Sequence, residues 1–390
     1  MSIPMAPSSE IFIDDILKKS LIFKEKRLDL IGRTNTMMKK MLTKLSAIIL
    51  SGLMAATILT GCGSKSGDSA KKEVNVICWS EYLPDDVISS FEEEKGITVN
   101  MTTYTSPDDM LAKVQSSKAG TYDLIIAPEN YAPIFSKQNL LEKLDRDKIP
   151  NYTNIDSKYL GRENDPDNTY SFPYMFASAV IAVNTDVIKD KIESYADLLN
   201  SKYKDKIVII EDSRAVYSMA AMAEGCDAND TSDKTLKAVE SYLTKLLPNI
   251  HAFDGDSPKT LMINGECPIG LIYGAEALLA QKEVSSIKCY YPKEGVYLAS
   301  DSLMITADAQ NKDNAYELMN YIMDGDVSAK ISEEFPYINP NKAALEKLGT
   351  EYSENPLTNP ADDVINRACT LTDIGDNISK IVDLWTKIKG

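Results

Sequence analysis

The chain of 390 residues contains four short segments in which carboxylates, hydroxyls or aromatic rings directly follow an apolar run. The segments are Trp79-Ser80-Glu81-Tyr82, Ala127-Pro128-Glu129-Asn130, Glu211-Asp212-Ser213-Arg214 and the single residue Tyr273. Carboxylates beside aromatic rings suit the binding of organic cations, because an ammonium group donates hydrogen bonds to carboxylates and is attracted to aromatic faces. A helix cap or a surface turn would explain any one segment alone.

The apolar runs before these segments predict buried strands, and each segment stands at the same place relative to its strand. In open α/β sheets, ligands bind beyond the carboxyl ends of the strands. Four polar or aromatic segments at that position therefore predict a binding cleft rather than four unrelated turns.

The region after residue 73 begins with alternating strand and helix patterns. We predict strands at 74–79, 97–101 and 122–127, and helices from Pro84 to Gly96 and after Ser106. Both helices begin with a proline and two acidic residues, which suit a helix N-terminus. Strand, helix, strand, helix, strand within about fifty residues indicates a parallel sheet with right-handed crossovers.

The rest of the chain repeats this alternation. Further strands are predicted at 179–184, 206–210, 268–273 and 302–305, and helices at 195–199, 216–223, 234–247, 275–281, 312–323 and 374–388. A body of about 320 residues exceeds one typical hydrophobic core, so we expect two lobes.

A basic and then apolar segment near the N-terminus predicts export. Three lysines precede the run Leu45–Leu59, which has no charged residue. A run of about 15 residues suits a secretory signal and is short for a membrane span, although a transmembrane anchor is the alternative. Its ending, Leu59-Thr60-Gly61-Cys62, resembles the lipobox of bacterial lipoproteins. The resemblance implies cleavage before Cys62 and a lipid on the Cys62 sulfur.

The N-terminal region is thus expected to have three parts. Residues 37–61 would be a lipoprotein signal peptide, and residues 62–73, rich in Gly and Ser, a lipid-anchored flexible tether. Residues 1–36 are an extension to which we assign no role, and we favour a start at Met37 or Met38. The folded body is then expected at the outer face of the cytoplasmic membrane or in the periplasm.

Composition narrows the range of partners. Residues 62–390 carry 33 basic and 53 acidic side chains, a net charge of −20. Such a surface is a poor partner for nucleic acid and suits cationic solutes. The single histidine, His251, leaves little material for a metal site or a catalytic triad, so we expect neither, and no cofactor. The five cysteines after Cys62 form no C-x-x-C pair and are expected to pack as small hydrophobic residues.

Several further stretches carry a family resemblance. They are Trp79–Pro84, Gly120–Ile125, Tyr170–Tyr174, Tyr291–Gly295, Asp301–Leu303 and Tyr337–Asn341. In order and spacing the chain from about residue 74 to 384 resembles the bacterial spermidine/putrescine-binding proteins of ABC importers. The resemblance implies an α/β, two-lobed periplasmic-binding-protein fold of type II, each lobe a mainly parallel sheet with flanking helices. Lobe 1 would comprise 74–178 and 300–346, and lobe 2 would comprise 179–299 and 347–390.

The resemblance also implies a binding site. Six residues match family positions that hold the polyamine, Tyr273 stands where a tryptophan is usual, and two more come from the strand ends. The candidate ligand-binding residues are Trp79, Ser80, Glu81, Tyr82, Asn130, Asp212, Tyr273, Asp301 and Tyr337. At five positions this chain departs from the residues that are usual in the family. Pro128 replaces a serine, Asn130 a tyrosine, Ala215 a glutamate, Ala299 a tryptophan and Leu371 a glutamine. One carboxylate and one stacking ring are therefore missing.

The residues and the resemblance together predict a monomeric, extracellular solute-binding lipoprotein. It would capture spermidine, putrescine or a related small organic cation by closure of its lobes and deliver it to an ABC permease, without chemistry of its own. One alternative is a binding protein for another amine or a zwitterion. Another is a secreted hydrolase that uses paired acids such as Glu81 and Asp301, although G-x-S-x-G and H-E-x-x-H motifs are lacking.

Overall fold

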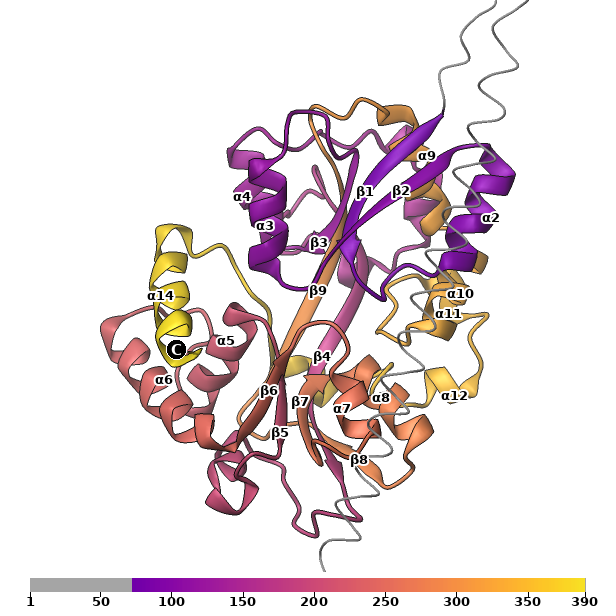
Figure 1. Cartoon of the computed structure of the whole chain (residues 1–390). Helices are drawn as coiled ribbons and strands as arrows, with labels where there is room; N and C mark the ends of the chain where they lie inside the picture. Colours follow the sequence, from indigo (N-terminus) through magenta and orange to yellow (C-terminus); the bar gives the residue numbers. More distant parts are fainter. Residues whose placement is uncertain (1–71, 390) are drawn as a thin grey trace, which may run out of the picture. The chain divides into compact units, whose positions relative to one another are not determined.

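The computed structural model describes residues 72–389, a mixed α/β chain built on two hydrophobic cores (Figure 1). One core draws its buried residues from 74–175 and 303–331, and the other draws them from 179–388. We call the parts built on these cores the first lobe and the second lobe. The lobe boundaries given above stay a prediction.

The N-terminal predictions fall outside the described residues. These are the extension at 1–36, the signal peptide at 37–61, the lipid site Cys62 and all but the end of the tether. Within residues 72–389, no helix is both long enough and apolar enough to cross a membrane.

Three parallel strands form the centre of the first lobe, as the sequence predicts. They are β1 (Glu73–Trp79), β2 (Thr98–Tyr104) and β3 (Leu124–Pro128), in the order β2-β1-β3. The connections contain α2 (Asp85–Lys95) and α3 (Pro107–Ser116), which carry the predicted acidic first turns. Parallel neighbours require such crossovers, so the alternating pattern predicts the strand direction correctly.

The second lobe has an equivalent set of three parallel strands. They are β5 (Ile207–Ile210), β6 (Ile250–Asp254) and β7 (Ile269–Tyr273), in the order β7-β5-β6. Between β5 and β6 lie α5 (Ser213–Ala223) and α6 (Asp233–Leu246). The sequence does not predict β6, because its residues include His251 and Asp254 and give no continuous apolar run.

Two long antiparallel strands, β4 (Phe172–Asn184) and β9 (Val296–Ile305), pass between the lobes and lie side by side in Figure 1. The first half of β4 pairs with β9 and its second half pairs with β7, while the end of β9 pairs with β3. Hydrogen-bonded strands therefore run without a break from β2 to β6, and each lobe adds an antiparallel strand to its three parallel ones.

The sequence predicts only the second part of each crossing strand. Pro173 interrupts the start of β4, because a proline cannot donate to the ladder of hydrogen bonds. The structure accommodates it by a shift of pairing register between Pro173 and Met175. The two strands are therefore longer than predicted, and they form the whole sheet connection between the lobes.

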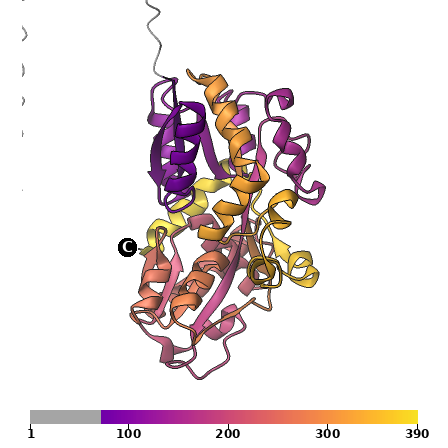
Figure 2. The ribbon, with the colours of Figure 1, turned by 90° about the vertical axis from the view of Figure 1, so that its right-hand side faces the viewer.

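Helices cover the sheet of each lobe (Figures 1 and 2). In the first lobe α9 (Lys312–Ile322) packs against β1 and β9, and in the second α14 (Ile378–Lys389) packs against α5 and α6. The remaining helices and strands are α4 (Tyr131–Lys137), α7 (Pro258–Ile263), α8 (Gly274–Glu283), α10 (Gly325–Glu334), α11 (Lys342–Leu345), α12 (Thr350–Ser353), α13 (Asp362–Asn366), β8 (Ile287–Tyr290) and β10 (Ala368–Cys369). The helix predicted at 195–199 is a 3-10 turn.

The five cysteines of the described residues are all free thiols. Cys78 and Cys267 are buried and pack in the lobe cores, as predicted for small hydrophobic residues. Burial raises the pKa of the Cys267 thiol to about 11, so the thiol stays neutral and unreactive near pH 7.

Candidate functional site

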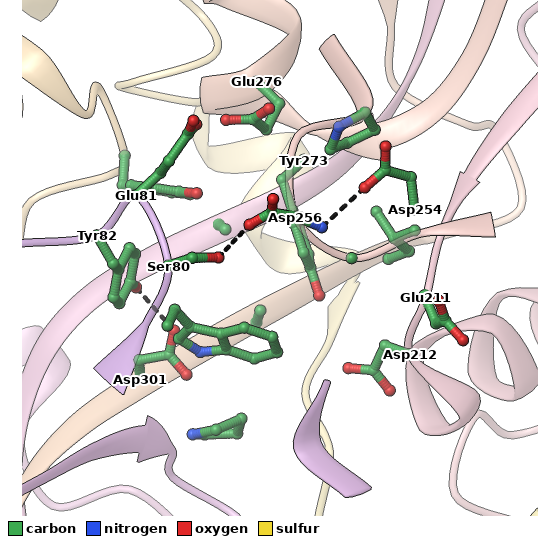
Figure 3. Close-up of a pocket in the computed structure, with 18 of the residues that line it drawn as sticks. Ser80, Glu81, Tyr82, Glu211, Asp212, Asp254, Asp256, Tyr273, Glu276 and Asp301 are labelled. Atoms are coloured by element: carbon green, nitrogen blue, oxygen red, sulfur yellow. Dashed lines mark hydrogen bonds between the residues drawn. The ribbon is translucent and has the colours of Figure 1, made fainter. Parts of the chain in front are cut away.

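A cavity lies between the lobes, where the carboxyl ends of β1, β5, β6 and β7 face the crossing strand β9 (Figure 3). Eight of the nine candidate residues line it: Trp79, Ser80, Glu81, Tyr82, Asp212, Tyr273, Asp301 and Tyr337. Trp79 and Tyr273 are the last residues of β1 and β7, and Asp212 caps α5 two residues after β5. The rule that ligands bind beyond the carboxyl ends of the strands in an α/β sheet thus predicts the location of the cavity.

Asn130 does not line the cavity. It is buried, two residues after the end of β3, and it directly precedes α4. Its neighbour Glu129 is held by Arg162 Nε, at 2.9 and 3.0 Å, and accepts a hydrogen bond from Ser300 Oγ at 2.6 Å. Of the segment that ends β3, only Pro128 reaches the cavity, because it pairs directly with Asp301 across the sheet.

Asp301 is a buried carboxylate in the middle of β9. Its Oδ2 accepts a hydrogen bond from Tyr82 Oη at 2.7 Å, whereas its Oδ1 is buried and has no hydrogen-bond partner among the described residues. Burial raises the pKa of Asp301 to about 7, although Tyr82 and the indole N–H of Trp79 lower it. Trp79 Nε1 lies near this carboxylate without the geometry of a full hydrogen bond and is itself unpaired among the described residues.

Asp212 has a structural role as well as a place in the cavity. Its Oδ1 accepts hydrogen bonds from the backbone N–H groups of Arg214 and Ala215, both at 2.9 Å, and so caps α5. Burial raises the pKa of Asp212 to about 6, and the two capping N–H groups oppose the rise. The cap uses one oxygen only, which leaves Oδ2 for the cavity.

Aromatic rings from both lobes stand around these carboxylates. Trp79 packs on Tyr104 with ring centroids 4.4 Å apart, and Tyr82 meets Tyr337 edge to face at 4.9 Å. On the side of the second lobe, Tyr273 lies 6.4 Å from Tyr297. The rings supply flat apolar walls whose faces also attract cations.

All charged side chains of residues 72–389 that line the cavity are acidic. Its lining contains seven carboxylates, Glu81, Glu211, Asp212, Asp254, Asp256, Glu276 and Asp301, and no Lys, Arg or His among the described residues. No three His, Cys, Asp or Glu side chains within 72–389 are grouped as the ligands of a metal ion would be. The arrangement can therefore bind an organic cation through carboxylates and rings.

Comparison with known proteins places the chain in a family. Residues 86–360 match the profile of the family described as bacterial extracellular solute-binding protein. The chain belongs to this family. The spermidine/putrescine-binding periplasmic protein of Escherichia coli (strain K12) is 34% identical to this solute-binding protein over 312 residues, which cover 80% of this chain and 90% of the relative.

Solved structures of similar proteins share the fold. A spermidine/putrescine ABC transporter substrate-binding protein from Streptococcus pneumoniae superposes with a TM-score of 0.69 at 26% identity, over 82% of this chain and 98% of that one. The Tp0655 lipoprotein of Treponema pallidum superposes with a TM-score of 0.71 at 25% identity, over 81% of this chain and 99% of that one. The two-lobed architecture of this solute-binding protein is therefore that of its family.

The family resemblance selected Asp301 and marked Ala299 as a departure, but sequence reasoning missed other lining residues of this solute-binding protein, among them Tyr297, Asp254 and Asp256. Tyr297, Ala299 and Asp301 lie two residues apart in β9 and so share one face of the strand. Their spacing is a usable signal, but it is lost when the strand is predicted to begin at 302. Asp254 is the last residue of β6 and Asp256 follows the strand, and without that strand the sequence offers no reason to select them.

Lys259 contributes a cation at the edge of the cavity. Its Nζ donates to the two oxygens of Glu276 at 3.1 and 3.2 Å, to Ser257 Oγ at 3.0 Å and to Glu81. Burial lowers the pKa of Lys259, but the two carboxylates outweigh this effect and the pKa lies above its usual value. Burial also raises the pKa of Glu276, against the influence of Lys259.

The segment 254–259 of the second lobe touches the first lobe directly. Asp256 accepts a hydrogen bond from Ser80 Oγ, drawn in Figure 3, and Gly255 packs against the backbone of Thr105. A Cβ atom on Gly255 would lie 2.1 Å from the Thr105 carbonyl oxygen, so only glycine fits this approach. The two lobes are therefore in contact at the mouth of the cavity.

Proposed function

We propose that this solute-binding protein captures a small organic cation, spermidine or putrescine in the first place, and delivers it to an ABC permease. The observation that carries the proposal is the buried Asp301 carboxylate, which lines an aromatic cavity and whose Oδ1 has no hydrogen-bond partner among the described residues. The Escherichia coli and Streptococcus pneumoniae relatives are named for the same two polyamines.

The chemistry of an ammonium group matches this carboxylate. The group has three donors, and each charge-assisted hydrogen bond contributes roughly 1.5–3 kcal/mol. Burying an unpaired carboxylate is costly, so a ligand cation that pairs with Asp301 removes a penalty as well as adding bonds. The methylene groups between two amines would pack on Trp79 and Tyr273, whose rings face the cavity.

Binding would be coupled to closure of the lobes. Trp79 and Tyr82 belong to the first lobe, Asp212 and Tyr273 belong to the second, and a ligand between them touches both. A ligand stabilises the closed state only by its greater affinity for that state. The crossing strands β4 and β9 form the sheet connection about which the lobes would move.

The alternatives receive less support from the cavity. The carboxylate of a zwitterion would favour a cationic partner, and the cation that stands beside the described lining, Lys259, is already paired with Glu81 and Glu276. A hydrolase with Glu81 and Asp301 as paired acids would need both groups free, but Lys259 holds Glu81 and Tyr82 holds Asp301. We therefore propose a monomeric binding protein without catalytic activity.

We also propose that a lipid on Cys62 anchors the protein to the membrane. The Treponema pallidum protein of the same fold is named a lipoprotein, which supports the lipobox interpretation. Labelling of cells with a fatty-acid probe tests this point. Cys62→Ala should abolish labelling and leave the precursor uncleaved, whereas equal labelling of the variant would refute the anchor.

A thermal-shift screen tests the proposed ligand class. The folded body, residues 72–390, is mixed with polyamines, amino acids and quaternary amines in separate wells. Diamines or triamines should raise the unfolding temperature, since a ligand that binds only the folded state stabilises it. A rise with amino acids alone would contradict the proposal, and turnover of any compound in the panel would contradict the absence of catalysis.

A further inference from the structure

Three of the seven carboxylates in the cavity already have a lysine partner. Glu81 and Glu276 share the ammonium group of Lys259, and Glu211 pairs with Lys389. Figure 3 shows Glu81 and Glu276 together at one end of the cavity. That end thus has the carboxylates that a ligand cation needs, but the protein's own cation occupies them.

Lys259 is held firmly in this position. It is the second residue of α7, and only 16% of its side chain is exposed. Its strongest partner, Glu276, is 7% exposed and meets the ammonium group through both carboxylate oxygens. Removing the cation would leave a buried carboxylate without compensation, which is strongly unfavourable.

The same ammonium group joins the two lobes. Glu81 follows β1 of the first lobe, whereas Lys259 and Glu276 belong to α7 and α8 of the second. A primary ammonium group between carboxylates of two lobes is the arrangement that we propose for a ligand amine at Asp301. Lys259 therefore presents the same chemical group as one end of a polyamine.

We propose that Lys259 acts as a built-in ammonium group that fills the Glu81/Glu276 end of the cavity, so that the site selects diamines over triamines. The inference rests on the proposed function. A ligand could use Glu81 and Glu276 only by displacing Lys259, and the lysine charge repels any further ammonium group that approaches this end.

The carboxylates left for the ligand are Asp212, Asp254, Asp256 and Asp301, which form no ion pair within residues 72–389. Asp254 already accepts two backbone N–H groups and Asp256 accepts the Ser80 hydroxyl, so Asp212 and Asp301 remain to match two ammonium groups. The third ammonium group of spermidine would have to enter the end that Lys259 fills. The number of cationic centres, rather than the length of the methylene chain alone, is then what the site distinguishes.

The test is calorimetric titration of putrescine and spermidine into the wild type and three variants. Lys259→Met removes the cation and keeps the side-chain volume, whereas Lys259→Arg retains a cation. Lys282→Met removes a lysine from an exposed ion pair with Glu351 on the same lobe and serves as the matched control. Lys259→Met should raise the affinity for spermidine relative to putrescine by about tenfold or more, since one charge-assisted pair becomes available. Lys259→Arg and Lys282→Met should keep the wild-type ratio.

The outcomes separate the two proposals. An unchanged ratio in Lys259→Met, or an equal change for both amines, would overturn the role of Lys259 while leaving polyamine binding in place. No binding of either amine by the wild type would overturn the proposed function and this inference with it. If Lys259→Met does not fold, the double variant Lys259→Gln/Glu276→Gln removes the buried acid together with its cation and should shift the ratio in the same direction.

Discussion

The Tyr82 hydroxyl donates a 2.7 Å hydrogen bond to Oδ2 of Asp301 and leaves the other oxygen of that carboxylate buried at the cavity wall. The bond fixes the orientation of the carboxylate and also favours its ionised form. Tyr82 comes from the first lobe at the end of β1, and Asp301 comes from the crossing strand β9. The tyrosine therefore positions the group that we propose as the anchor of the ligand.

Replacing Tyr82 by Phe should weaken binding of putrescine. The variant keeps the ring that packs edge to face on Tyr337 and loses only the hydroxyl. Without this donor the pKa of Asp301 rises further, and a smaller fraction of the carboxylate is ionised at pH 7. A hydrogen bond to a charged group contributes about 1.5–3 kcal/mol, so the dissociation constant should rise roughly tenfold or more.

The matched control is Tyr122→Phe, which alters a tyrosine outside the cavity lining. Titration of the Tyr82 and Tyr122 variants under the same conditions compares the two hydroxyls. Equal affinities for Tyr82→Phe and wild type would show that the Tyr82 hydroxyl does not support the anchor.

Affinity for a diamine should fall as the pH is lowered from 8 to 5.5. The pKa of Asp301 is about 7 and that of Asp212 is about 6, both raised first by burial. A cationic ligand binds the ionised carboxylates, so protonation competes with it, and the ligand ammonium groups stay charged because their pKa is near that of lysine, about 10. The dissociation constant should increase roughly tenfold or more over this range.

The free energy of unfolding without ligand should increase as the pH is lowered, whereas the affinity decreases. The folded pKa of Asp301, about 7, lies above the value of about 3.9 expected in the unfolded chain. Between pH values of about 3.9 and about 7 the folded state binds more protons than the unfolded state. The contribution of Asp301 to the free energy of unfolding is therefore complete at low pH and is lost as the pH rises toward about 7. Urea unfolding at pH 5 and pH 7.5, for wild type and Asp301→Asn, measures this contribution. For the preceding prediction, a wild-type affinity for the diamine that is the same at pH 8 and pH 5.5 would contradict the role of Asp301 as a buried anchor.

Gly255→Ala should weaken ligand binding without unfolding the protein. The new methyl group would meet the carbonyl oxygen of Thr105, a backbone atom that cannot move aside, and would hold the lobes apart. Since ligand binding is coupled to closure, the affinity for putrescine should fall at least about tenfold, a loss of about 1.4 kcal/mol.

Gly349→Ala is the control for this prediction, because a Cβ atom there meets nothing within 4 Å and its φ of −71° suits any residue. The two variants should have similar unfolding temperatures without ligand, and only Gly255→Ala should lose affinity. Wild-type affinity in Gly255→Ala would show that the contact with Thr105 is not needed for binding.

The sequence predicts β1, β2, β3, β5 and β7 and the helices α2, α3, α5 and α6, because each of these elements has a local pattern, whereas it misses β6 and α7. It predicts the crossing strands poorly, since Pro173 and the polar residues of β9 do not look like the centre of a sheet. Because the predicted strand began too late, the prediction of the binding site was incomplete. With β9 begun at Val296, the alternation along the strand would have placed Tyr297 and Ala299 in the cavity together with the predicted Asp301.

Lys259 shows a different limit of sequence reasoning. It lies 178 residues from Glu81 in the chain, in a helix of six residues that has no clear pattern of its own. From the sequence, a lysine on such a short segment is expected to be solvated. Only the folded structure shows that it lies between the carboxylates of Glu81 and Glu276. Asn130 is the reverse case, because it is a polar residue at the expected strand end that is buried before α4 and is not part of the cavity lining.

The central claim is that Asp301 anchors an ammonium group, and Asp301→Asn tests it most directly. The variant keeps the shape of the side chain and removes its charge, while Asp313→Asn, at an exposed ion pair with Lys148, controls for the loss of one carboxylate. Calorimetric titration with putrescine, and with spermidine as the second amine, at pH 7.5 should show tight binding of putrescine by wild type and Asp313→Asn. For Asp301→Asn it should show a loss of about 1.5–3 kcal/mol, roughly tenfold or more in affinity. Unchanged affinity in Asp301→Asn would contradict the anchor, and no binding of either amine by the wild type would contradict the polyamine assignment itself.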